Sequence, residues 1–254
     1  MSGLINDIAE AIQLILSGDA EIYGILFRSL FFSGSAIILA ILWGTPLALL
    51  ISMKEFRGKT VIKSLFNTLI GLPTVVLGLL LFLIFSRAGP LGFLGLLYTP
   101  GAIIIGQAIL VTPILVSIGI SAIESVDPEI KNLAKTLGAS ESQAQIAVLK
   151  EAINGIILSD IASFNRAIGE LGVVLLVGGN IAGGGNRTDV LTSAISRATQ
   201  IGDVGLAVAL GILLIVVLFT INIIILALRN TSYLINLARG PYSKLKQLRE
   251  TEQK

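Results

Sequence analysis

The chain has 254 residues, 54% of them hydrophobic and only 13% charged, with a formal net charge of +2. So few charges cannot cover the surface of a soluble domain of this size, which points to a membrane protein. Cysteine and histidine are both absent, so we expect no disulfide, no catalytic residue and no metal site in this chain.

The first segment, residues 1–20, predicts a helix that lies on a membrane surface. Isoleucines recur at helical spacing on one face, whereas Asn6, Asp7 and Glu10 lie elsewhere on the helical wheel. Such a helix is too polar to span a membrane and suits the interface. A loosely held terminal helix is the alternative that this pattern leaves open.

Long runs without charge predict about five transmembrane helices. About 20 apolar residues suffice to cross the hydrocarbon core. The predicted spans are residues 27–52, 64–86, 100–122, 153–178 and 204–228. We therefore expect an all-α, polytopic membrane protein that forms a single domain over residues 1–254.

Lysine and arginine are distributed unevenly around these spans. With five spans, thirteen of them share one side of the membrane and four lie on the other. The side richer in lysine and arginine is normally cytoplasmic. We expect a multi-pass protein of the cell membrane with its N-terminus outside and its tail, residues 229–254, in the cytoplasm.

One segment, residues 124–155, has the pattern of a soluble helix pair. Asp127 and Pro128 are typical of a helix start, and Gly138 accepts the left-handed geometry of a helix end. Ser140 and Gln143 then form a predicted capping box for a second helix. We call residues 124–155 the elbow and expect it to be a stiff cytoplasmic turn between two helices.

The elbow resembles the EAA loop of ABC importer permeases. The resemblance is carried by Asn132-Leu-Ala, the core Leu137-Gly-Ala-Ser140 and the apolar helix up to Leu149. It departs where Asn132 replaces the usual glutamate and Lys150 replaces a proline, although this lysine lets the helix continue toward the fourth span. A packed loop without a partner is the alternative.

The resemblance implies the type I ABC importer permease fold and a coupling role for the elbow. Its turn should dock on an ATPase subunit and pass nucleotide-driven motion to the membrane helices. The coupling residues it implies are Leu137, Gly138, Ala139, Ser140, Glu141, Ser142 and Gln145.

Further stretches are similar to those of molybdate and tungstate permeases. They begin at Gly71-Leu-Pro73, Gln107-Ala-Ile, Phe164-Asn-Arg166 and Val177-Gly-Gly-Asn180. The five-span layout and the stretch after the fourth span look most like the tungstate branch. Molybdate, or another oxyanion, is the alternative cargo. From a different class, a secondary transporter or a channel remains possible, although no inverted repeat is visible.

The resemblance also implies partners. They are a second copy of the chain, two ATP-binding cassette subunits, an extracytoplasmic tungstate-binding protein and membrane lipid, but no nucleic acid. The chain has no phosphate-loop motif, so ATP and Mg are expected on the partner ATPase and no cofactor in this chain.

Two charges, Arg166 and Glu170, fall inside the fourth predicted span. They could line an anion path or form an ion pair one helical turn apart. Asp160 is expected near the start of that helix, where a carboxylate is favoured. Pro73, Gly78 and Asn180 are further candidates for the path or a gate, and for the first two the alternative is a structural role in bending or packing the second span.

Overall fold

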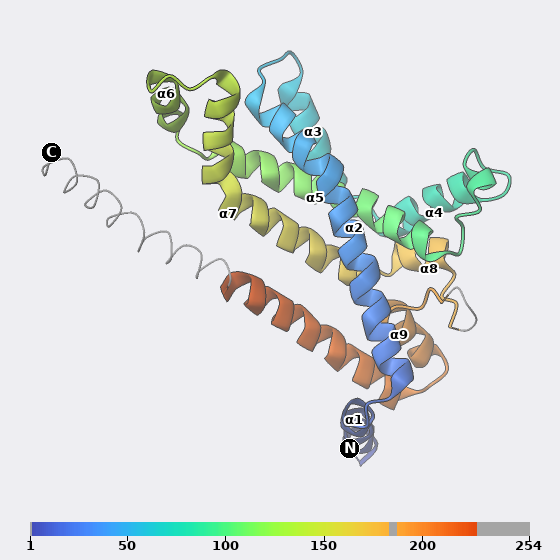
Figure 1. Ribbon diagram of the computed structural model, residues 1–254. Helices are drawn as coiled ribbons and strands as arrows, with labels where there is room; N and C mark the ends of the chain where they lie inside the picture. The colour runs from blue at the N-terminus through green and yellow to red at the C-terminus, as the bar shows by residue number, and fades with distance from the viewer. Residues whose placement is uncertain (1, 183–186, 228–254) are drawn as a thin grey trace, which may run out of the picture. The chain divides into compact units, whose positions relative to one another are not determined.

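The computed structural model describes residues 2–182 and 187–227, and this part of the chain is helical, without a strand (Figure 1). The all-α prediction is thus confirmed. In chain order the elements are α1 (Ser2–Leu16), α2 (Ala20–Met53), α3 (Lys59–Ile70), α4 (Thr74–Phe85), η1 (Gly92–Leu94), α5 (Pro100–Glu124), α6 (Pro128–Thr136), α7 (Glu141–Ile168), α8 (Gly172–Gly178) and α9 (Leu191–Gln200), followed by the helix Val204–Ala227.

Three of the described helices are individually long and apolar enough to cross a membrane: α2, α5 and Val204–Ala227. Two pairs qualify only together, α3 with α4 at a bend of 99° and α7 with α8 at a bend of 58°. Five predicted spans therefore correspond to three long helices and two bent pairs. The second and fourth spans were wrongly predicted to be continuous.

The chain forms two compact units, residues 1–214 and residues 215–254. The described part of the second unit is helical from 215 to 227. The predicted cytoplasmic tail, 229–254, lies outside the described residues, and the single-domain organisation stays a prediction.

Helix α5 is the central helix of the first unit. Thr99 caps it, accepting a hydrogen bond from the backbone N–H of Ala102, and Pro100 occupies its first turn as expected. The start of α5 packs with α4 and α8, its middle with α2 and α7, and its end with the last turns of α2. Small residues permit this packing, because a Cβ on Gly44 of α2 would come 2.8 Å from Leu115 of α5.

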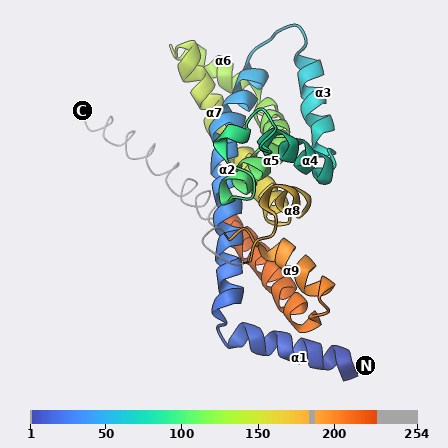
Figure 2. The ribbon, with the colours of Figure 1, turned by 90° about the vertical axis from the view of Figure 1, so that its right-hand side faces the viewer.

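The ends of the first unit differ in character. At one end α6 and the start of α7 form the elbow (Figure 1). At the other end α1 runs across the axis of α2 instead of continuing it (Figure 2), with a corner at Gly18, whose φ is 71°, and a cap at Asp19. The helix predicted over residues 1–20 is present, while its place in the membrane interface stays a prediction.

Helix α9 was not predicted from the sequence. Its buried residues Leu191, Ala194 and Ala198 are spaced along one face. Leu191 and Ala194 pack against Ile22 and Ile25 of α2 and against the start of the helix Val204–Ala227. Because α9 has only 10 residues, its apolar face is too short to resemble a span, and its helicity depends on this packing.

Candidate functional site

The elbow has the local geometry that its sequence predicts. Asp127 caps α6 by accepting a hydrogen bond of 2.9 Å from the N–H of Glu129. Gly138 follows α6 with φ at 87°. The capping box is present, with 2.8 Å from the Ser140 N–H to the Gln143 side chain and 3.3 Å from the Gln143 N–H to the Ser140 hydroxyl. At the turn, α6 therefore ends with backbone hydrogen bonds around Gly138, and α7 begins with a side-chain capping box.

Ion pairs add a second brace across the elbow. The Glu141 carboxylate lies 2.7 Å from the ammonium of Lys131 and 2.6 Å from that of Lys135. Hydrogen bonds from these two lysines, Lys131 first, lower the pKa of Glu141 to about 2. Glu141 is thus ionised at any physiological pH, and it joins the start of α7 to two turns of α6.

The turn of the elbow presents an apolar surface to the outside of this chain. Leu133 is 61% exposed, Leu137 79% and Ile146 51%. Gln145 is half-buried, and it lines with Ile146 a cavity of about 270 Å³ between α7 and the end of α2. Exposed leucines beside charged side chains are typical of a surface that a partner covers.

Helix α7 continues from the elbow without a break as far as Ile168. This confirms that Lys150 lets the helix run on. It also corrects the prediction for Asp160, which lies in the middle of α7, far from any helix N-terminus. Its Oδ1 is buried without a hydrogen-bond partner among the described residues, so the helix dipole does not explain its presence there.

Of the two alternatives for Arg166 and Glu170, the ion pair is present in the structure. Arg166 donates from its guanidinium to the Glu170 carboxylate at 2.7 Å, and the side chains are 35% and 2% exposed. The other Glu170 carboxylate oxygen accepts the N–H of Val173 at 3.0 Å. Glu170 thereby starts α8 with a side-chain bond to its first turn, which is the physical reason for the bend between α7 and α8.

The break in the second span lies at Gly71, Leu72 and Pro73, between α3 and α4. Pro73 precedes α4 in extended conformation, as a proline at a helix start allows. Gly78 does not bend α4 but lies at its contact with α8, where a Cβ would come 3.1 Å from the Gly172 carbonyl oxygen. The structure therefore brings Gly78 close to the α7–α8 bend, and Thr74, which follows Pro73, lies against Gly172 as well.

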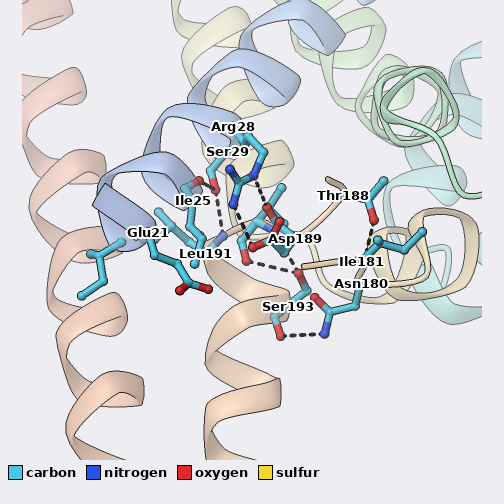
Figure 3. A network of polar contacts seen from close by, with 12 residues as sticks. Glu21, Ile25, Arg28, Ser29, Asn180, Ile181, Thr188, Asp189, Leu191 and Ser193 are labelled. Carbon is cyan, nitrogen blue, oxygen red and sulfur yellow. Dashed lines mark hydrogen bonds and ion pairs between the residues drawn. The ribbon is translucent and has the colours of Figure 1, made fainter. Parts of the chain in front are cut away.

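Asn180 belongs to another part of the molecule, beyond α8. It has φ of 50° and donates to the carbonyl oxygen of Ser193 at 3.3 Å. Figure 3 shows it beside the segment that leads into α9. Residues 183–186, shortly after it, lie outside the described residues.

Sequence reasoning missed the polar network of that region (Figure 3). Arg28 of α2 donates to the Asp189 carboxylate at 2.8 Å, and the Asp189 side chain is fully buried. The Ser29 hydroxyl accepts the N–H of Leu191 at 2.7 Å, and Thr188 donates to the Gly178 carbonyl oxygen at 2.6 Å. The available signal was Arg28 itself, the last charge before a long apolar run.

Helices long and apolar enough to cross a membrane, with a braced elbow at one end of the unit, are the arrangement expected of a membrane transport subunit. Comparison with known proteins gives the family. Residues 31–231 match the binding-protein-dependent transport system inner membrane component family. The chain belongs to this family of transport permeases.

Three curated relatives are similar over most of their length. The tungstate uptake system permease protein TupB of Peptoclostridium acidaminophilum is 37% identical, over 86% of this chain and 95% of the relative. The TupB of Campylobacter jejuni is 32% identical, over 87% and 92%. A probable anion ABC transporter permease protein of Haloferax volcanii is 38% identical, over 76% and 84%.

Proposed function

We propose that this chain is the membrane-spanning permease subunit of an ATP-driven importer that carries tungstate into the cytoplasm. The observation that carries the proposal is the similarity to two tungstate uptake permeases over 86% and 87% of the chain. Molybdate is the second candidate cargo, because the two tetrahedral dianions differ little in size. The chain transports and does not itself hydrolyse ATP.

The complete importer contains more than this chain. A binding protein outside the cell delivers the anion, two ATPase subunits bind ATP and Mg, and two copies of the permease enclose the path across a two-fold axis. The chain needs no cofactor of its own for this role. The distribution of lysine and arginine supports a cell-membrane orientation with the N-terminus outside and the elbow in the cytoplasm.

The elbow is the docking surface for the ATPase. Leu137 and the residues from Gly138 to Ser142 lie at its turn, and the exposed leucines supply the apolar contact. Caps and ion pairs keep the turn from deforming. Because α7 is continuous from Glu141 to Ile168, a push on the turn moves α7 as a rod and reaches the bend at Glu170.

A change in the bend between α7 and α8 opens and closes the anion path. Arg166 and Glu170 hold the bend between α7 and α8, Gly78 lets α4 rest against α8, and Pro73 separates α3 from α4. Asn180 lies at the end of the path remote from the elbow. Arg166 is neutralised by Glu170, so it holds the anion weakly, and weak binding favours release.

The test is uptake by the whole complex in proteoliposomes. We expect ATP-dependent accumulation of tungstate when the permease, its ATPase and the binding protein are present, with weaker competition by molybdate. Omitting the binding protein is the control. If the complex hydrolyses ATP but accumulates neither anion, the assignment of tungstate as cargo is wrong. If it accumulates both anions equally, the importer is not specific for tungstate.

A further inference from the structure

One outward face of the first unit carries a group of uncharged polar side chains. It is formed by α3, α5 and α7, and its polar side chains are exposed or half-exposed. Most of them are hydroxyls and amides, whereas the charged Lys63 of α3, Glu124 of α5 and Glu151 of α7 lie beside them at the elbow end of this face. The members used below are Ser64, Asn67 and Thr68 of α3, Ser117 and Ser121 of α5, and Asn154 of α7; we call them the neutral row.

A hydrogen bond brings the row together across two helices. The Ser117 hydroxyl donates to the side-chain oxygen of Asn67. The Asn67 amide nitrogen keeps both N–H groups without an acceptor among the described residues. The hydroxyl of Ser121 donates to the carbonyl oxygen of Ser117 at 3.1 Å. By rotating, this hydroxyl can instead donate to another acceptor that comes close.

Helix α7 borders the same face. A Cβ on Gly155 would come 2.5 Å from Ala122 of α5, so the two helices touch there. On the far side of this contact, Ala152 and Ile156 of α7 are buried in one cluster with Ala48 of α2. The exposed side of α7, which carries Asn154, therefore faces away from α2, as the exposed side of α5 does.

Two members of the row, Ser117 and Asn67, lie at membrane depth. Glu124 ends α5, where it pairs with Lys63 at 2.5 Å. Ser117 precedes Glu124 by seven residues, which is about 10 Å at the helical rise. Asn67 contacts Ser117 and thus lies at a similar depth. An amide exposed to hydrocarbon at this depth leaves its N–H groups unsatisfied and is strongly disfavoured.

Two outward faces of the same unit, on α2 and α4, expose large apolar side chains instead. Ile38 and Leu42 on α2 are 65% and 68% exposed, and Leu79 and Leu83 on α4 are 49% and 54% exposed. These surfaces suit lipid or a dry protein contact. The first unit thus has one outward face with polar side chains and others that are apolar.

We propose that the neutral row is the wall of the anion path, where hydroxyl and amide donors bind the oxyanion in passing. This inference rests on the proposed function. A tetrahedral oxyanion offers acceptors in every direction, so rotating hydroxyls and the free Asn67 amide can follow it. Lysine or arginine in the same place would hold a dianion too firmly for rapid release. The nearest cation on this face, Lys63, is already paired with Glu124.

The absence of cysteine from the chain makes the test direct. In the assembled complex, Asn67→Cys and Ser121→Cys should react with a membrane-impermeant thiol reagent applied from the elbow side. Leu42→Cys and Leu83→Cys are the matched dry controls. We expect reaction at least tenfold faster at the row, and slower when the complex is trapped with the path closed to the elbow side.

The outcomes separate this inference from the proposed function. Reaction at the row no faster than at the controls, in a complex that imports tungstate, overturns the path and leaves the function standing. Disulfide-linked dimers without reagent access also overturn it, since the row is then a dry contact between copies. Fast reaction in a complex that imports another oxyanion supports the path and contradicts the cargo.

A charge variant gives an independent readout. Ser121→Asp should lower oxyanion uptake at least tenfold while leaving complex assembly intact, because a fixed anion repels the dianion. Ser121→Asn, a neutral donor of similar size, should retain most of the uptake. Equal loss in both variants points to a packing role and contradicts the path.

Discussion

Arg28 of α2 and Asp189 before α9 are 161 residues apart in the sequence, yet the guanidinium lies 2.8 Å from the carboxylate. Arg28 also donates to the backbone carbonyl oxygen of Asp189 at 3.1 Å. The Asp189 side chain has no exposed surface, whereas that of Arg28 is 16% exposed. The pair thus fixes the chain entering α9 against the second helix.

Because Asp189 is fully buried, the stability of the protein depends on the charge of Arg28. Arg28→Met leaves a buried carboxylate unpaired and should destabilise the protein by about 3–5 kcal/mol. The check is thermal unfolding in detergent. Arg197→Met is the control, since Arg197 has no ion pair within the described ranges; an equal loss in this control contradicts a specific role for the pair.

The pair of Arg166 and Glu170 predicts a similar asymmetry. Arg166→Met leaves Glu170, with its side chain 2% exposed, unpaired, and should cost about 3–5 kcal/mol. Glu170→Gln keeps an oxygen for the Val173 N–H and should cost about 1–3 kcal/mol.

The double variant Arg166→Met with Glu170→Leu separates stability from transport. Removing both charges should recover part of the stability, and unfolding in detergent measures this. Uptake well below that of the native complex, in a double variant that folds and assembles, indicates that the pair serves the path. Native uptake limits the pair to a structural role.

Gly78 predicts a steric limit between α4 and α8. A Cβ there would come 2.9 Å from the Leu176 side chain and 3.1 Å from the Gly172 carbonyl oxygen. Because the Gly172 backbone cannot move away easily, Gly78→Ala should lower the free energy of unfolding by about 1–3 kcal/mol. Gly34→Ala in α2 meets no atom within 4 Å and should be neutral or stabilising by up to about 1 kcal/mol. Unfolding in detergent compares the two, and equal effects contradict the tight contact.

The elbow predicts a loss of coupling without a loss of folding. Gly138 has φ of 87° and its N–H donates to the Lys135 carbonyl oxygen at 2.9 Å. Proline cannot adopt this φ and has no N–H to donate, so Gly138→Pro should abolish uptake. Ala139→Asp should do the same through the ATPase contact, with the protein still inserted in the membrane.

Uptake and ATPase activity of the assembled complex are the measurements for both elbow variants. Gln200→Asp, an exposed change at the end of α9, is the control for added charge. Normal uptake by Gly138→Pro or Ala139→Asp counts against the elbow as a coupling device.

Local signals determined much of this protein. Charge-free runs located the membrane helices, and Asp127, Gly138 and Ser140 marked the helix ends of the elbow because caps act within three or four residues. The contact of Arg166 with Glu170 was one of two alternatives that the sequence left open, since one helical turn separates them. The sequence likewise sufficed to place the chain among ABC importer permeases.

Tertiary structure decided the rest. The bend at Glu170 depends on that side chain turning back to Val173, and α9 depends on burial against α2. Arg28 meets Asp189, Asn67 meets Ser117 and Gly78 meets α8 only after the helices have packed. Periodicity and caps report on a few neighbouring residues, whereas these contacts join segments whose separation along the chain carries no signal of their proximity in space.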